Sequence, residues 1–444
     1  MYKISDQIKN IFYILIFIAL IIRLGIIIVT YINLDKSPQG DELDYISYAN
    51  NIIAQGVVVP DISLLRGNAH LIGPGFPLVL ATLFRIFGEN YFPVFLLNAL
   101  LSTAVVGLIF FIGRDVFNEK IAIFATGWAS FYVLFIKYIP SILKETIILF
   151  LFLWFIYSFI KETKRNRISW MSLYPTFIYA YLIHVDERYF SYLPIILIFY
   201  ILLDRISFNN GMKKAILFFV IVSLLMIPWL IRNYVVYGDR VVILTERTAR
   251  FTDKYFGYDP LLSFYGQKQL KYSKFKWDES LIDDILAGKE VSGLKGKRYR
   301  SLKKGIEAGF IPYKFNTTEK RISNFKELYR PIRLHPGYID TGFRFVEGAW
   351  SIKHNLSVGL SYGLLLPFFL YGGLMIIKYK QKYGLFFICI IIVHTLIHVI
   401  YFTGKERYRI PIDTLIILIA FYGLYHISLY LQNKPLRLDS NILK

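Results

Sequence analysis

The sequence has few charged residues and almost no cysteine. Of its 444 residues, 18% are charged, whereas soluble domains carry about 25%, which argues against an ordinary cytosolic enzyme. The single cysteine, Cys389, cannot form an intramolecular disulfide and lies in an apolar run, so it gives no information on redox compartment. The P-loop pattern G-x-x-x-x-G-K-S/T is also absent, and nucleotide-driven transport is therefore not supported.

Apolar residues dominate instead. They make up 55% of the chain, and the mean hydropathy is +0.47. A membrane-spanning helix needs about 20 mostly apolar residues. We therefore predict an all-α polytopic membrane protein with about ten transmembrane helices. The candidate spans are residues 10–32, 92–113, 119–136, 142–160, 170–184, 188–203, 214–236, 357–377, 384–402 and 410–431.

The basic residues indicate how these spans are oriented. The net charge is +20, and Lys and Arg gather in alternate connections between the spans. The positive-inside rule then places both termini in the cytoplasm, and the first span is expected to be retained rather than cleaved as a signal peptide. Because the basic residues are dispersed beside the spans, a nucleic-acid role is disfavoured.

Two long connections, 33–91 and 237–356, then lie outside the membrane. The second is too long for a tight connector and is expected to hold a small domain or surface helices. We divide the chain into an N-terminal catalytic module with the first outer loop, a large outer loop, and C-terminal helices with a cytoplasmic tail: 1–236, 237–356 and 357–444.

The first outer loop is predicted to form two surface helices. Apolar residues recur at helical spacing between Gly40 and Gly56, which predicts an amphipathic helix on the membrane surface. A second apolar segment, 76–88, is shorter than a full span. Asp41 stands where a helix N-cap would, and backbone N–H bonds there would keep its carboxylate ionised, as a general base requires.

Polar residues cluster at five places, all on the predicted outer side. Ionisable residues close to hydrocarbon are costly and are often functional, so we predict one extracytoplasmic site. Arg232, Arg407 and Arg409 have two interpretations: they extend into the headgroup layer beside aromatic residues, or they bind a lipid phosphate. The clusters are Asp41-Glu42, Lys144-Glu145, His184 to Arg188, Arg232-Asn233 and Lys405 to Arg409.

Arg23, His394 and His398 also lie inside predicted spans. Arg23, in the first span, is expected to pair with a carboxylate or to extend towards the interface. His394 and His398 lie four residues apart and share a helix face. Two ligands are too few for a zinc site, so interhelical hydrogen bonds are the preferred interpretation.

The order of these motifs resembles that of the GT-C superfamily of membrane glycosyltransferases, in particular the bacterial relatives of protein O-mannosyltransferases and of the lipid A aminoarabinose transferase. The resemblance extends over residues 10–430. The matching residues are Gly40-Asp41-Glu42 with Tyr45 and Ala49, Pro74 to Leu78 with Leu80-Ala81 and Phe87-Gly88, Glu145, Pro228 to Asn233, and Glu406 to Arg409 with Pro411.

The resemblance implies a polyprenyl-phosphate sugar donor and an acceptor hydroxyl on a lipid, glycan or protein, at the outer face of the cytoplasmic membrane. It assigns the catalytic base to Asp41 and a second acidic position to Glu145. The Trp-Trp-Asp motif of oligosaccharyltransferases is absent, which argues against that metal-dependent branch. No cofactor is implied with certainty, and assistance by a divalent cation stays open.

The chemistry of glycosyl transfer calls for the same residue types. Its oxocarbenium-like transition state needs a base, a carboxylate that tolerates positive charge, and cations for the departing phosphate. We expect an inverting displacement with Asp41 as base and Glu42 or Glu145 as the second carboxylate. The predicted substrate-binding residues are Lys144, Arg188, Arg232, Asn233, Glu406, Arg407 and Arg409.

Two other classes of membrane protein are considered. A transporter would be expected to place charges and broken helices near the bilayer midplane, often in two related halves, whereas these clusters lie at one interface. A polysaccharide polymerase or ligase also combines many spans with a large outer loop, but it gives no reason for Asp41-Glu42 after the first span.

Overall fold

The computed structural model describes residues 5–33, 38–56, 72–165, 168–204, 206–237, 318–331, 352–401 and 404–432, with Asp284 and Ala287. Within these ranges the chain forms helices and no strand, which confirms the predicted all-α class. Among the described residues, seven helices are long and apolar enough to cross a membrane. They are α1 (Asp6–Asn33), α4 (Phe92–Val116), α7 (Glu145–Thr163), α10 (Phe208–Tyr237), α16 with α17 (Ile352–Ser361, Leu366–Lys378), α18 (Lys382–Leu396) and α19 (Glu406–Leu431).

The other three predicted spans are helical but shorter. Residues 119–136 break between Ser130 and Val133, and residues 170–203 form two helical segments that meet near Asp186. The elements are α5 (Glu119–Ser130), α6 (Val133–Lys137), η3 (Trp170–Ser172), α8 (Leu173–Val185), η4 (Glu187–Tyr192) and α9 (Leu193–Leu203). Each apolar run therefore supplies a helix, but the breaks leave some of them too short to span alone.

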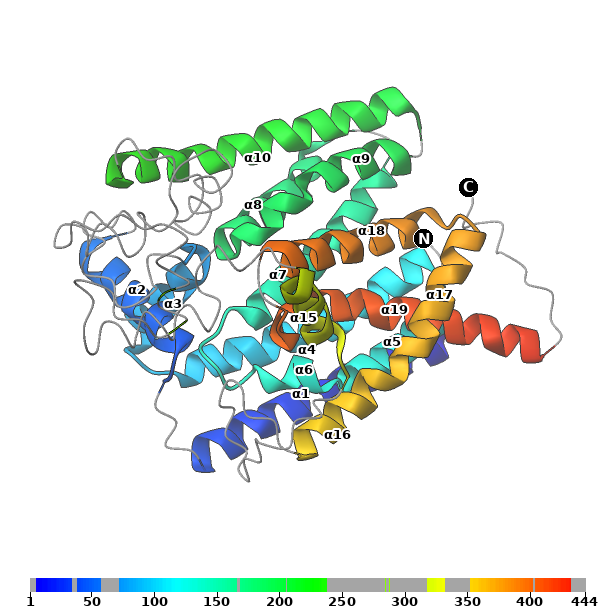
Figure 1. The fold of residues 1–444 in the computed structure, drawn as a ribbon, viewed down its shortest axis with the longest axis horizontal. Helices are drawn as coiled ribbons and strands as arrows, with labels where there is room; N and C mark the ends of the chain where they lie inside the picture. Colours follow the sequence, from blue (N-terminus) through cyan, green and yellow to red (C-terminus); the bar gives the residue numbers. More distant parts are fainter. Residues whose placement is uncertain are drawn as a thin grey trace.

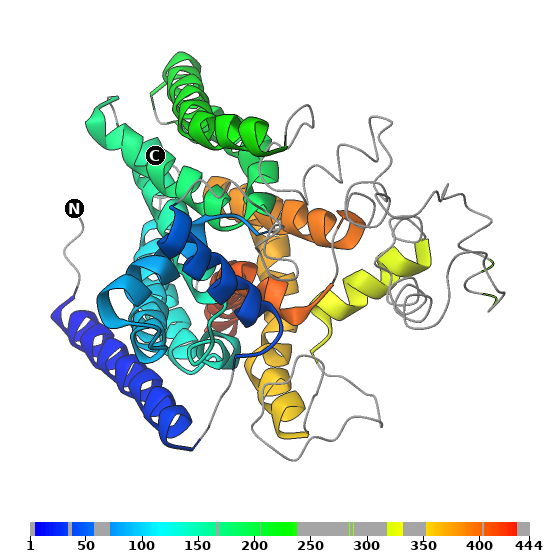
Figure 2. The same cartoon turned by 90° about the vertical axis from the view of Figure 1, so that its left-hand side faces the viewer.

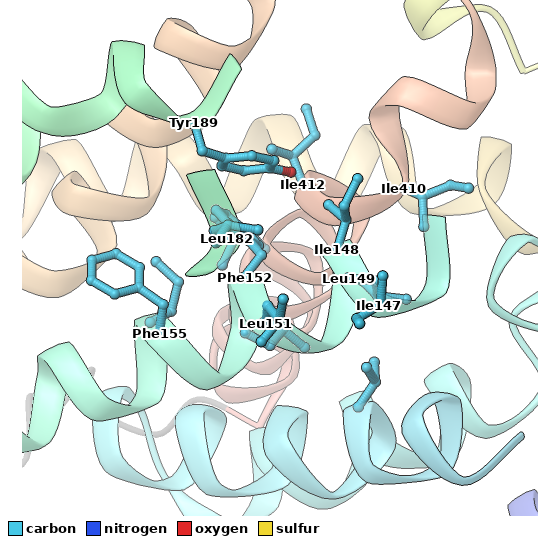
Figure 3. Close-up of a cluster of buried hydrophobic side chains, with 14 of the residues drawn as sticks. Ile147, Ile148, Leu149, Leu151, Phe152, Phe155, Leu182, Tyr189, Ile410 and Ile412 are labelled. Carbon is cyan, nitrogen blue, oxygen red and sulfur yellow. The ribbon is translucent and has the colours of Figure 1, made fainter. Parts of the chain in front are cut away.

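Helix α7 lies at the centre of the bundle. Its apolar residues face every direction and are buried on all sides, as expected for a helix surrounded by other helices. Figure 3 shows this cluster, in which residues of α7 meet Leu182 of α8, Tyr189 of η4, and Ile410 and Ile412 of α19. Helix α1, by contrast, exposes Phe17, as expected of a lipid-facing helix.

The two ends of the bundle carry different polar residues. At one end, Lys161 binds the Asp115 carboxylate at 2.7 Å, and Lys164 donates to the Asp115 backbone carbonyl at 2.6 Å. Lys214 binds the Asp204 carboxylate at 2.8 Å. These residues belong to the basic connections that the sequence places on the cytoplasmic side. The α17–α18 turn lies at this end, on the right in Figure 1, while α2 (Asp41–Gln55) and α3 (Gly75–Phe87) lie on the left.

The predicted surface helix α2 covers the opposite end, as Figure 2 shows from that side. Its buried residues pack on α3, with the rings of Tyr45 and Phe76 5.0 Å apart, so its apolar face is covered by protein. The helix is capped by Gly40 at φ +56°, and Asp41 is its first residue. The N-cap interpretation of Asp41 was therefore wrong.

Most of the predicted outer loop 237–356 lies outside the described residues. The described part includes α15 (Thr318–Tyr329), which packs on α19 and on a π-helical turn, η8 (Ile397–Tyr401). The Asn324 side chain donates to the Val399 carbonyl at 3.1 Å. One helix of the outer loop thus lies against the helices that carry the predicted site residues.

Helices α17 and α19 cross at two glycines. A Cβ atom on Gly372 would overlap the Ile419 carbonyl oxygen, and one on Gly423 would overlap that of Phe368. Small residues of this kind let membrane helices approach closely. The crossing fixes α19, whose first turn carries Arg407.

We predict that Gly372→Ala lowers the free energy of unfolding by about 1–3 kcal/mol because the added methyl group forces the two backbones apart. The measurement is thermal unfolding of the purified protein in detergent. Gly373→Ala is the matched control, since a Cβ atom added to Gly373 would meet nothing within 4 Å. Equal melting temperatures for the two variants would contradict the role of this crossing.

Candidate active site

The interruption between α5 and α7 needs polar partners, because its backbone groups lie inside an apolar bundle. Arg23 of α1 donates to the Ser130 carbonyl at 3.1 Å and to the Ser102 hydroxyl at 2.9 Å. Ser102 in turn donates to the Phe135 carbonyl at 2.8 Å. Arg23 was expected to pair with a carboxylate or to extend to the interface; instead, it is fully buried and binds backbone at the helix break.

The loop after α6 is held in the same way. Asn98 of α4 donates to the carbonyls of Ile139 and Ser141 at 3.1 and 2.9 Å. The Ile142 N–H donates to Glu42 at 3.0 Å, and the other Glu42 oxygen accepts from Gln39. Glu42 is buried and thus orients the loop that leads into Glu145. The Glu42 carboxylate therefore supports this loop, and Glu42 is not among the residues that line the nearby cavity.

Arg407 lies between the two carboxylates that the sequence singles out. Its Nη2 atom donates to Asp41 Oδ2 at 2.9 Å, and its Nε atom is 3.7 Å from Glu145 Oε1. Its Nη2 also donates to the Tyr408 hydroxyl at 3.0 Å. Asp41 is 44% exposed at its side chain, whereas Glu145 is buried. One cation thus joins an accessible carboxylate to a buried one.

One carboxylate oxygen of Glu145 is not used in the contacts described above. In the part of the chain that the structure describes, its Oε2 atom is buried and has no hydrogen-bond partner. Burial, followed by the charges of Glu145 and Asp41, raises the pKa of the nearby Tyr45 well above its ordinary value. Tyr45 therefore stays neutral beside these carboxylates.

A second charged group includes Lys144, the residue before Glu145 in the sequence. Lys144 and Arg188 both bind Asp186, with Lys144 Nζ 3.1 Å from Oδ2 and Arg188 Nε 2.8 Å from Oδ1. Burial alone would raise the pKa of Asp186, but the two cations hold it well below its ordinary value. Asp186 thus stays ionised and fixes both cations.

These two groups border one small cavity. About 10 Å³ in it is accessible to the centre of a water molecule, which is roughly the space of one water site. Two arginines and one carboxylate face it among aromatic and histidine side chains. The lining residues are Glu145, Ile148, Arg188, Tyr189, Tyr192, His394, His398, Arg407, Tyr408 and Pro411.

The remaining predicted residues lie outside the cavity lining. Arg409 is fully buried, donates to Asp413 at 2.7 Å and to the Leu328 carbonyl at 2.8 Å, and covers the Tyr362 ring. It joins α15 to α19. Glu406 binds Lys137 of α6 at 2.6 Å.

Arg232 and Asn233 form a local pair near the end of α10. The Arg232 guanidinium lies 4.7 Å from the Trp229 ring centroid and donates to Asn233 Oδ1 at 3.0 Å. Both residues are buried, and neither lines the cavity. Asp186 and Tyr408, by contrast, belong to the site; they fall in predicted clusters, but no pattern in the sequence assigns them a role.

The residues do not fit a divalent cation well. Asp41 and Glu145 are bridged by a positive guanidinium, and the described ranges contain no group of three or more acidic, histidine or cysteine side chains arranged to bind a metal. Hard cations are held by several oxygen ligands.

Comparison with known proteins supports the class suggested by the motifs. The family model described as dolichyl-phosphate-mannose-protein mannosyltransferase matches residues 72–231. No curated protein sequence matches the chain at a significant level.

Solved structures of an archaeal oligosaccharyltransferase have a similar fold. The chain is similar to the oligosaccharyltransferase AglB from Archaeoglobus fulgidus in complex with an inhibitory peptide and a dolichol-phosphate, with 13% identity, a TM-score of 0.55, and coverage of 99% of this chain and 53% of that one. The same enzyme in complex with Zn and sulfate has 11% identity and a TM-score of 0.55, and the match covers 95% of this chain and 50% of that one. ArnT from Cupriavidus metallidurans in the apo state has 12% identity and a TM-score of 0.45, and the match covers 93% of this chain and 60% of that one.

The fold is GT-C-like, and the resemblance in the motifs is confirmed at the level of the fold. The chain spans about half the length of the AglB structures. The matched family region contains α3 to α9 and most of α10, and therefore carries Glu145, Asp186 and Arg188.

We predict that Asp186→Asn lowers stability by about 3–5 kcal/mol because Lys144 and Arg188 lose their buried counter-ion. The pKa of Asp186 is lower in the folded than in the unfolded protein, so its contribution is complete above about pH 4 and is lost as the pH falls through the folded-state value. The melting-temperature difference from wild type should thus be the same at about pH 7 and pH 5.5.

Glu89→Gln, which alters an exposed carboxylate, is the control for this measurement. It should leave the melting temperature nearly unchanged. An Asp186→Asn protein as stable as wild type at neutral pH would show that the two cations do not depend on this carboxylate.

Proposed function

We propose that this protein is a glycosyltransferase that moves a sugar from a polyprenyl-phosphate donor to an acceptor hydroxyl on the outer face of the cytoplasmic membrane. One observation carries the proposal: Arg407 joins Asp41 to Glu145 beside a cavity that Arg188 also lines. These four residues come from four distant segments of the chain. The matched family description, which names a lipid monophosphate sugar donor and a protein acceptor, supports a donor of this class.

The exposure of the two carboxylates suggests different roles. Asp41 is accessible and can accept the proton of an incoming hydroxyl. Glu145 is buried, lines the cavity and has an oxygen without a hydrogen-bond partner, so it can stabilise positive charge at the anomeric carbon. The hydroxyl oxygen forms the new bond to that carbon from the side opposite the phosphate. The bond to the phosphate oxygen breaks, the electron pair leaves with polyprenyl phosphate, and the sugar configuration inverts.

The departing phosphate needs cations beside it. Arg188 and Arg407 both line it, and their guanidinium carbons lie 4.4 and 5.0 Å from the centroid of the Tyr408 ring. We therefore assign the donor phosphate to this pair, with Lys144 nearby on Asp186. Arg232, Asn233, Glu406 and Arg409 make other contacts, and we assign them supporting roles.

The two ends of the bundle support this sidedness of the site. The basic connections at residues 161–165 and 204–214 meet at one end, which the positive-inside rule places in the cytoplasm. The candidate site lies at the other end, beside α2. The acceptor is a hydroxyl on a lipid, glycan or protein, and the surrounding membrane lipids are the other expected partners.

We predict that Asp41→Asn lowers the rate of transfer by at least about 100-fold because the amide cannot accept the proton. Membranes containing the protein are supplied with labelled polyprenyl-phosphate sugars, and the products are identified by mass spectrometry. Asp44→Asn, in the same turn of α2, is the matched control. Wild-type transfer by Asp41→Asn would exclude this base, and sugar retained on the lipid in every sample would count against transferase activity with these donors.

We predict that Arg188→Gln raises the KM for the donor by about tenfold or more, since a charged phosphate contact is lost. Arg409→Gln should instead lower the melting temperature and change the donor KM less than about twofold, because Arg409 contacts Asp413 and Leu328. Steady-state kinetics with the same labelled donor distinguish the two variants. The reverse pattern would place the phosphate near Arg409.

A further inference from the structure

Two stacked histidines line the cavity, and the identity of their partners fixes where their protons lie. His394 Nε2 is 2.7 Å from the Tyr408 carbonyl oxygen. Since a carbonyl only accepts, Nε2 carries the hydrogen, and Nδ1 accepts from the Tyr192 hydroxyl. His398 Nδ1 is 2.8 Å from the His394 carbonyl and therefore also donates.

The last ring nitrogen faces an arginine. His398 Nε2 lies 2.8 Å from Arg188 Nη1. A guanidinium has donors and no acceptor, so His398 Nε2 must present a lone pair, and the ring is neutral. All four ring nitrogens of the pair are thus engaged, and His398 accepts a hydrogen bond from a residue that lines the cavity.

The backbone places His398 for this contact. It lies in the π-helical turn η8, and such turns shift the register of a helix and are frequent at functional sites. Its ring stacks on His394 at 4.2 Å and on Tyr408 at 5.4 Å between centroids. Val399, in the same turn, is held by Asn324 of α15.

We propose that His398 is a positioning residue that holds Arg188 in place for the phosphate of the donor lipid. This inference rests on the proposed function, which assigns that phosphate to Arg188 and Arg407. Asp186 binds the Nε and Nη2 side of the guanidinium, and His398 binds Nη1 from the other side. A neutral acceptor fixes the guanidinium without cancelling its charge, whereas a second carboxylate would reduce its attraction for phosphate.

The test measures lipid binding without requiring turnover. Wild-type protein in nanodiscs is titrated with undecaprenyl phosphate and, separately, with undecaprenol, and bound lipid is quantified by native mass spectrometry. His398→Phe keeps a stacking ring but lacks the acceptor, and His398→Gln restores an acceptor on a flexible side chain. We expect His398→Phe to weaken binding of undecaprenyl phosphate about tenfold, and His398→Gln to stay within about threefold of wild type.

His426→Phe is the matched control, because His426 is another buried histidine of the bundle, stacked on Tyr379 near the far end of α19. It should bind both lipids as wild type does. Arg188→Gln, which removes the cation itself, should weaken binding of the phosphate lipid at least as much as His398→Phe. Undecaprenol binding should be the same in every variant.

The outcomes separate the inference from the proposed function. If wild type prefers undecaprenyl phosphate over undecaprenol but His398→Phe binds it equally well, or if Phe and Gln weaken it equally, His398 does not position Arg188. If wild type binds the two lipids equally, the phosphate site itself is wrong. Should His398→Phe not yield folded protein, His398→Leu takes its place, since it also lacks an acceptor.

Discussion

The site depends on how the bundle satisfies the backbone between α5 and α7. Helical hydrogen bonding stops at Ser130, and the chain does not resume a long helix until Glu145. Carbonyl and N–H groups left without partners in an apolar interior cost several kcal/mol each. Side chains of Arg23, Ser102 and Asn98 supply partners from α1 and α4, and Glu42 supplies one from α2.

These supports explain why so many polar residues are buried in so apolar a chain. Tyr132, at the same interruption, donates to Asp413 at 2.8 Å, and Asp413 binds Arg409. Lys137, at the end of α6, binds Glu406. The interrupted segment is thus joined to the first turns of α19, and this brings Arg407 to the start of α7. Buried ion pairs are weak evidence for stability. In this protein, the ion pairs of Lys137 with Glu406 and of Arg409 with Asp413 instead fix the position of the charged residues around the cavity.

Much of this arrangement could be predicted from the sequence. Apolar runs gave every long helix, because an apolar stretch of that length has few other stable structures. The convergence of Asp41, Glu145 and Arg407 also followed, since alternate connections of a helical bundle meet at the same end. The roles of Glu42 and Arg409 did not follow. Their partners are a backbone N–H in a distant loop and a carbonyl in α15, and no local pattern indicates such contacts.

Helix α15, from the predicted outer loop 237–356, is also connected to the candidate site by hydrogen bonds between side chains and backbone. Helix α15 accepts from Arg409 through the Leu328 carbonyl and donates from Asn324 to the turn that carries His398. Tyr329 of α15 also hydrogen-bonds Thr395, one turn from His398. A shift of α15 would therefore move the first turn of α19 and the π-helical turn together. These two turns carry Arg407 and the hydrogen-bond partner of Arg188, so α15 is connected through them to both arginines that line the cavity.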